Sequence, residues 1–278
     1  MDIIEAIIIG IIQGLTEFLP VSSSAHLMFA QYAFNVSESG LAFDVFVHLG
    51  TLVAVIFFFR EDIIKLLRAW WLSIGDILQN RFKEGLELDP YKRMAWLVLI
   101  ATIPVGLVGI LFESQVEALF AGALYVPGFF LFVTGTILYL SQRINKNKVN
   151  FENMGLKESI FMGLAQACAI LPGLSRSGTT IASGLVIGLN KEFAAKFSFI
   201  LSIPAILGAT LVQATSIGSA IDTNFLAMFL GFIAAALSGY FAIKWLLEII
   251  QKRSLDIFAY YCWIMGIIIF MGSITHIF

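Results

Sequence analysis

Six long, mainly apolar stretches dominate this sequence, and each is close to the roughly 20 residues that a helix needs to cross a bilayer. Only 13% of the residues are charged, about half the share found in soluble domains. The sequence therefore predicts an all-α integral membrane protein that forms one polytopic domain over residues 1–278. The six expected spans are Leu41–Phe59, Met94–Phe112, Ala118–Leu140, Phe197–Ile221, Phe225–Ile243 and Ile257–Thr275.

Two further apolar regions, Ile3–Gln31 and Ser159–Asn190, are interrupted by proline-containing segments at Leu19–Ser24 and Leu171–Ser175. Proline removes a backbone donor and keeps the preceding residue out of the helical conformation. Irregular backbone at membrane depth survives only where it is buried in protein or lines a wet cavity. We therefore expect two re-entrant helix–loop–helix hairpins in addition to the six spans.

The basic residues indicate how the chain is oriented in the membrane. Apart from Arg176, they lie in the connections 60–93, 143–157, 191–196 and 244–253, whereas the alternate connections 32–40, 113–117 and 222–224 carry only acids. The positive-inside rule places the basic set in the cytoplasm. Residues 60–93 are then a cytoplasmic amphipathic connection, in which we expect one helix over Glu61–Phe82 along the inner surface.

With this orientation the first hairpin enters the membrane from outside and the second enters it from inside. The two hairpins also share a pattern, because Gly10 and Gln13 match Gly163 and Gln166, and each break reads Leu-Pro-x-x-Ser. Residues 1–142 and 158–278 are therefore predicted to form an inverted-topology repeat. The prediction depends more on the order of segments than on the few matching letters.

The first break carries a set of residues suited to phosphate chemistry. Gln13 and Glu17 are four residues apart and share one helix face. Serine hydroxyls at a helix N-terminus attract phosphate, and a hydroxyl beside His and Glu can be activated as a nucleophile. A serine cluster that only caps the helix, with His26 hydrogen-bonded between helices, is the alternative. The candidate residues are Gln13, Glu17, Ser22, Ser23, Ser24 and His26.

The second break contains Arg176, a cation at membrane depth, which marks a functional site by default because burying it costs roughly 2.5–3.5 kcal/mol. Its planar fork of donors matches phosphate, and the neighbouring glycines allow close backbone approach. A structural arginine that caps carbonyls of a broken helix is the alternative. The residues expected to bind phosphate with it are Gly173, Ser175, Ser177, Thr179 and Thr180.

Other polar residues carry weaker signals. Asp44 and His48 share a helix face and are either a second layer around the site or an internal hydrogen-bonded pair. Cys168 and Cys262 form no disulfide or metal framework. The formal net charge of −2 and the absence of a basic face give no reason to expect nucleic acid, and the N-terminus has no basic segment typical of a cleaved signal peptide.

Together the two breaks resemble the motifs of the undecaprenyl-diphosphate phosphatase family, also called the bacitracin-resistance family. The first motif is Glu or Gln, then Glu four residues later, then Pro-Val-Ser-Ser ending in His; here it runs from Gln13 to His26. The second, Pro-Gly-x-Ser-Arg-Ser-x-x-Thr, is complete from Pro172 to Thr180. Many members have a second Glu where this chain has Gln13, so Glu17 is the only carboxylate in its first motif.

The resemblance implies hydrolysis of undecaprenyl diphosphate to undecaprenyl phosphate and phosphate, which recycles the lipid carrier of bacterial cell-wall (peptidoglycan) synthesis and confers bacitracin resistance. It also implies a multi-pass protein of the bacterial inner membrane with its site facing outside, and a divalent cation, Mg²⁺ or Ca²⁺. The expected partners are the polyprenyl diphosphate and membrane lipids, and the sequence leaves a homodimer open.

In the mechanism expected from the sequence, Ser23 attacks the terminal phosphorus, with His26 as base and later acid because their spacing permits contact. Direct attack by His26 is the rival scheme. Arg176 stabilises charge on the transferring phosphoryl group, and Glu17 either holds the cation or orients His26. A transporter or flippase for a polyprenyl phosphate is the competing function, since inverted repeats with broken helices are typical of transporters. Pure transport needs no base or nucleophile, which favours the enzyme.

Overall fold

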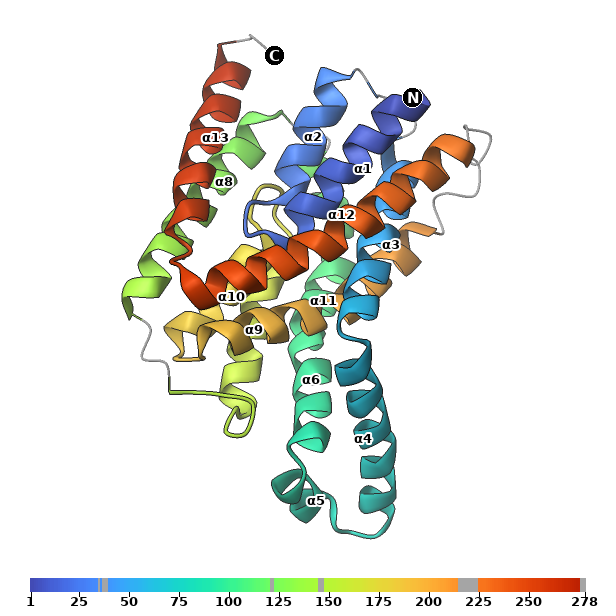
Figure 1. The fold of residues 1–278 in the computed structure, drawn as a ribbon, viewed down its shortest axis with the longest axis vertical. Helices are drawn as coiled ribbons and strands as arrows, with labels where there is room; N and C mark the ends of the chain where they lie inside the picture. The colour runs from blue at the N-terminus through green and yellow to red at the C-terminus, as the bar shows by residue number, and fades with distance from the viewer. Residues whose placement is uncertain (35, 37–39, 121–122, 145–147, 215–224, 276–278) are drawn as a thin grey trace.

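The computed structural model describes residues 1–34, 36, 40–120, 123–144, 148–214 and 225–275. These residues fold into a bundle of α-helices, as the sequence predicts (Figure 1). In chain order the helices are α1 (Ile3–Phe18), α2 (Ser23–Ala33), α3 (Gly40–Phe58), α4 (Arg60–Leu78), α5 (Phe82–Leu88), α6 (Pro90–Leu111), α7 (Glu113–Phe120), α8 (Tyr125–Ile144), α9 (Leu156–Cys168), α10 (Arg176–Val186), α11 (Lys191–Ala214), α12 (Phe225–Lys252) and α13 (Asp256–Ile274).

Both predicted hairpins are present, as the pairs α1–α2 and α9–α10, and their breaks fall where proline interrupts the apolar regions. Helices α2, α9 and α10 have 11, 13 and 11 residues. At 1.5 Å per residue they are about 16–20 Å long, well short of the roughly 30 Å hydrocarbon core of a bilayer. None of the three can cross a membrane alone, which supports the re-entrant interpretation.

The six expected spans correspond to α3, α6, α8, α11, α12 and α13, although their ends differ. Five of them are long and apolar enough to cross a bilayer, and α3 joins α4 through a bend of 82°. The predicted start of the third span at Ala118 is wrong, because Ala118 belongs to the short helix α7 and the span begins at Tyr125. Pro127 explains the new start, since proline fits the first turn of a helix but not its interior. Residues 215–221 of the fourth expected span lie outside the described residues.

The connection between α3 and α6 differs from the single surface helix that the sequence predicts. It consists of two helices, α4 and α5, and α4 packs against α6 rather than standing apart (Figure 1). An ion pair between Lys92 and Asp76 joins the start of α6 to α4. The amphipathic face of α4 is therefore partly used for packing against a span.

Helices of each chain half pack on helices of the other half, as a two-fold repeat predicts. Helix α1 packs on α12, its repeat counterpart α9 packs on α6, and the last spans of the halves, α8 and α13, pack on each other. A Cβ atom on Gly10 would lie 2.3 Å from the carbonyl oxygen of Gly231, and one on Gly163 would lie 2.4 Å from that of Ala101. The glycine pair matched by sequence thus allows the same close helix contact in both halves.

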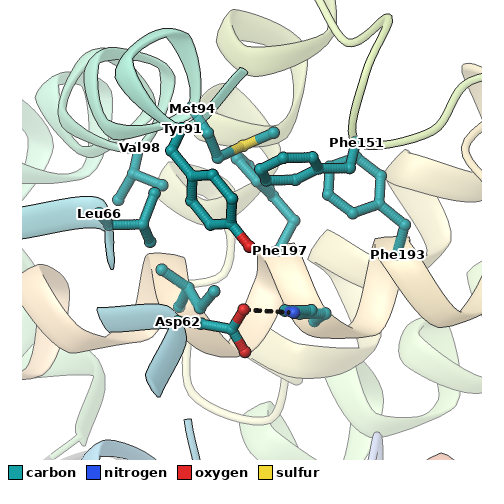
Figure 2. Close-up of a pocket in the computed structure, with 10 residues that line it drawn as sticks. Asp62, Leu66, Tyr91, Met94, Val98, Phe151, Phe193 and Phe197 are labelled. Atoms are coloured by element: carbon teal, nitrogen blue, oxygen red, sulfur yellow. Dashed lines mark hydrogen bonds and ion pairs between the residues drawn. The ribbon is translucent and has the colours of Figure 1, made fainter. Parts of the chain in front are cut away.

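A small, mainly apolar cavity lies where α4, α6 and α11 meet the segment around Phe151 (Figure 2). Its polar edge is an ion pair in which Lys196 of α11 donates to Asp62 of α4 over 2.7 Å. This pair connects α11 to the bend between α3 and α4. A different face of α11 carries Ser198, which contacts the residues described next.

Candidate active site

The tips of the two hairpins meet, although more than 150 residues separate them along the chain. The backbone N–H of Gly173 donates to Ser24 Oγ over 3.1 Å, and Ser177 Oγ donates to the carbonyl oxygen of Leu19 over 3.1 Å. Helices α2 and α10 begin at Ser23 and Arg176 respectively, so both helix N-termini lie at this junction. The predicted pairing of an acid/base loop with a cation loop is present in the structure.

The carboxylate of Glu17 is the centre of this junction. One oxygen, Oε1, accepts from Arg176 Nη2 over 2.6 Å, while Oε2 accepts from Ser23 Oγ over 2.6 Å and from Gln13 Nε2 over 3.1 Å. The Glu17 side chain is 7% exposed and that of Arg176 is 15% exposed. A single buried carboxylate therefore joins the candidate nucleophile to the candidate phosphate-binding cation.

Both helices that begin at the junction are capped by serine. Ser22 Oγ accepts from the N–H of Ala25, and Ser175 Oγ accepts from the N–H of Gly178. Gly173 precedes the second cap with a φ of +91°, and a Cβ there would lie 2.2 Å from the carbonyl oxygen of Pro127 in α8. Only glycine fits this position, because a side chain would meet both backbone strain and a clash.

Most hydroxyls predicted to bind phosphate hold the second loop in place. Ser177 bonds Leu19, and Thr180 Oγ1 donates to the carbonyl oxygen of Arg176 and contacts Ser198 Oγ at 2.5 Å. Among the described residues, two buried oxygens near the junction lack a hydrogen-bond partner, Thr179 Oγ1 and Gln13 Oε1. A buried polar atom without a partner costs about 1–3 kcal/mol, so these two atoms are candidates to contact a ligand.

His26 lies in the first turn of α2, but its ring turns away from Ser23. Its Nδ1 is 2.8 Å from the carbonyl oxygen of Ser22, and its Nε2 is 2.7 Å from the hydroxyl of Tyr261 in α13. The hydroxyl of Ser23 instead donates to Glu17. The expected Ser23–His26 hydrogen bond is therefore not present, although both residues lie at the site.

His48, on α3, also reaches the junction. Its Nε2 is 3.9 Å from Glu17 Oε2, and its Nδ1 is 2.6 Å from the backbone oxygen of Asp44. The carboxylate of Asp44 accepts from Gln31 rather than from His48. Of the two alternatives left by the sequence, a second layer around the site fits these contacts better than an internal side-chain pair.

A resident divalent cation at Glu17 does not fit the side chains around it. The described residues contain no group of three or more His, Cys, Asp or Glu side chains placed to hold a metal. Both Glu17 oxygens already have partners, one of them the cation Arg176. A metal would have to share this carboxylate with a guanidinium group, and the two positive charges would repel each other.

Three residues at the site were not predicted from the sequence: Tyr261 of α13, Thr134 of α8 and Ser198 of α11. Thr134 Oγ1 accepts from the N–H of Ser175 over 3.0 Å and donates to the carbonyl oxygen of Gly173 over 3.2 Å. The carbonyl oxygen of Ser198 accepts from Arg176 over 3.4 Å. Each belongs to a largely apolar helix that carries other hydroxyls, among them Thr136, Ser202 and Tyr260, so no local motif distinguishes it.

Comparison with known proteins gives the family of this chain. Residues 6–268 match the model of the family described as bacitracin resistance protein BacA. The chain belongs to the BacA family. Two relatives named undecaprenyl-diphosphatase are those of Methanobrevibacter smithii, 77% identical over 278 residues and covering 100% of both chains, and of Methanosphaera stadtmanae, 46% identical over 277 residues and 99% of both. A Bacteroides fragilis relative with the same name is 41% identical over 278 residues, 98% of this chain and 99% of its own. Membership of the BacA family extends over nearly the whole chain, so it includes both hairpins and α13.

Proposed function

We propose that this chain hydrolyses undecaprenyl diphosphate to undecaprenyl phosphate and inorganic phosphate. The observation that carries the proposal is the buried Glu17 carboxylate, which holds the Ser23 hydroxyl on one oxygen and Arg176 on the other. Phosphoryl transfer needs a nucleophilic hydroxyl, a base and a cation. Here the Glu17 carboxylate, as the base, contacts both the hydroxyl and the cation. The name shared by the relatives, undecaprenyl-diphosphatase, indicates which substrate to propose.

The terminal phosphate of the substrate binds at the N-termini of α2 and α10. Free N–H groups and the helix dipole favour an anion there, and Arg176 offers its planar fork to two phosphate oxygens. A phosphate that takes the donors of Arg176 releases Oε1 of Glu17 from its ion pair. Substrate binding thus frees the carboxylate to act as a base at the moment when Ser23 meets phosphorus.

The reaction then follows in two displacements. Ser23 Oγ forms a bond to the terminal phosphorus, its proton passes to Glu17 Oε2 over the existing 2.6 Å hydrogen bond, and the bond from phosphorus to the bridging oxygen breaks. Undecaprenyl phosphate leaves. Water then attacks the phosphoserine, the Ser23 oxygen recovers its proton, and inorganic phosphate is released. Arg176 and the N–H groups stabilise the charge that develops on the phosphoryl oxygens.

In this proposal a divalent cation takes part only if it binds together with the substrate. Because Arg176 and Ser23 hold Glu17 before substrate binds, a Mg²⁺ or Ca²⁺ ion that takes part would enter together with the diphosphate, whose oxygens are ligands that such hard cations prefer. Phosphate release should then stop in EDTA and return with added cation. The cation concentration needed for full activity should rise with the substrate concentration.

The wider role follows from the same substrate. Release of undecaprenyl phosphate at the cell membrane recycles the lipid carrier used to build the cell wall, and removal of the diphosphate lowers the amount that bacitracin can sequester. We place the site on the outer side of the membrane, because the basic connections favour the cytoplasm. The prenyl tail remains in lipid beside the spans.

The first experiment measures phosphate release from a prenyl diphosphate by detergent-purified protein. Wild-type protein should release phosphate, Arg176→Ala should lose both binding and turnover, and Ser23→Ala should bind substrate without turnover. Exposed Arg143, 43% exposed on α8, gives the matched control Arg143→Ala, which should keep full activity. Well-folded wild-type protein that releases no phosphate, with or without Mg²⁺ or Ca²⁺, would overturn the proposal in favour of lipid transport.

A further inference from the structure

A long-range contact joins helix α2 of the site to α13. Tyr261 in α13 and His26 in α2 are 235 residues apart, yet the Tyr261 hydroxyl lies 2.7 Å from His26 Nε2. The two rings are also stacked, with centroids 5.7 Å apart and planes 10° from parallel. The contact therefore fixes both the position of the imidazole and the direction in which it faces.

The partners of His26 determine which of its nitrogens carries hydrogen. The carbonyl oxygen of Ser22 can only accept, so Nδ1, 2.8 Å away, must carry the hydrogen. In the neutral ring Nε2 is then unprotonated and accepts from the Tyr261 hydroxyl. Both ring nitrogens therefore have partners, and the direction of Nε2 is set by Tyr261.

A second contact holds α13 against the same loop. The thiol of Cys262, the residue after Tyr261, donates to the carbonyl oxygen of Pro20 over 3.4 Å, and the Cys262 side chain is fully buried. Proline breaks the helix here, and the Cys262 thiol supplies a donor to its carbonyl oxygen. Tyr261 is thus carried by a helix segment that is fixed against the first hairpin.

Tyr261 also lies nearer to the surface than the Glu17–Arg176 pair does. It is 39% exposed, whereas Glu17 is 7% exposed. Tyr261 therefore joins the exposed surface of α13 to the buried residues of the site.

The structure assigns to Tyr261 the role of a positioning residue, whose hydroxyl holds the Nε2 edge of His26 and so fixes the imidazole at the N-terminus of α2. The inference rests on the proposed function and deepens it, because it gives the site a residue that sets the orientation of His26 and leaves the Ser23 proton to Glu17. Tyr261 itself acts through His26. Loss of its hydroxyl leaves the ring stacked but free to reorient, and misplacement by about 1 Å can cost about 100-fold in rate.

The test compares Tyr261→Phe with Tyr260→Phe in steady-state phosphate release from farnesyl diphosphate. Tyr260 is adjacent but half exposed, with its ring against Tyr139 and Trp263 on the α8 side, so its variant is the matched control. Tyr261→Phe should lower kcat about 10- to 100-fold with KM unchanged within about twofold. Tyr260→Phe should keep the wild-type kcat. A Tyr261→Phe enzyme with wild-type kcat overturns the inference.

A second comparison separates positioning from a purely structural role. If the Tyr261 hydroxyl acts through His26, then Tyr261→Phe should have no further effect on kcat in a His26→Ala background, although it lowers kcat in the wild type. Equal losses in both backgrounds would show that the hydroxyl acts independently of His26. Failure of the proposed function would look different, because wild-type protein and Tyr260→Phe would then also release no phosphate.

Discussion

The buried pair between Glu17 and Arg176 makes a strong prediction about stability. Replacing Arg176 by Met removes the 2.6 Å ion pair and leaves the carboxylate, 7% exposed, without its cation. Removing one partner of a buried pair costs about 3–5 kcal/mol. Ser23 and Gln13 still donate to Glu17, so we expect the lower end, about 3 kcal/mol. At about 2 °C per kcal/mol for a chain of this size, Tm should fall by about 6 °C.

The double variant Glu17→Gln/Arg176→Met tests the cause of that loss. A neutral amide keeps an oxygen for Ser23 and removes the unpaired charge, so the double variant should regain about 2 kcal/mol relative to Arg176→Met. Thermal unfolding in detergent, followed by intrinsic tryptophan fluorescence, measures both. Arg143→Met is the control, because solvent screens its exposed pair with Asp256 and the loss of such a pair should leave Tm nearly unchanged. A double variant less stable than Arg176→Met alone would refute the reasoning.

Two further predictions concern glycines. Gly173→Ala should lower both Tm and phosphate release, because a Cβ would lie 2.2 Å from a Pro127 atom and overpacking costs about 1–3 kcal/mol. Its control is Gly188→Ala, where φ is also positive but no atom lies closer than 4.0 Å; this variant should lose less stability and keep activity. Gly10→Leu should destabilise the contact between α1 and α12, whereas Gly109→Leu, on a glycine with open space around it, should leave Tm unchanged. Equal Tm values within either pair would contradict the packing argument.

The sequence was sufficient to predict the helical class, the two hairpins and the meeting of their two loops, but not the ion pair of Glu17 with Arg176. Apolar length identifies spans, and proline with an isolated charge identifies a break at membrane depth. The start of the third span was wrong because apolar composition continues from Ala118 through the break before Tyr125. Hydropathy alone cannot show that Pro127 belongs in a first turn.

The details of the site required tertiary structure. The spacing of Ser23 and His26 allows contact, but spacing does not fix the rotation of a ring about its side-chain bonds. That rotation is set by Tyr261, which lies 235 residues away in an apolar helix. His48 was visible as a polar residue in a span, yet only the packing of α3 beside α1 places its Nε2 3.9 Å from Glu17.

The exchanged packing of the two halves has an evolutionary consequence. The structural glycines occur twice, at Gly10 and Gly163, but the charged groups do not, since the position 153 residues after Glu17, at the same spacing, is Ile170. An inverted repeat of this kind is what duplication of an ancestral gene, with pairing of the two copies, would produce. Each copy could then specialise, one hairpin in the nucleophile and its base, the other in the anion-binding cation. Both halves would then be required for catalysis, because neither hairpin alone carries the nucleophile, the base and the anion-binding cation.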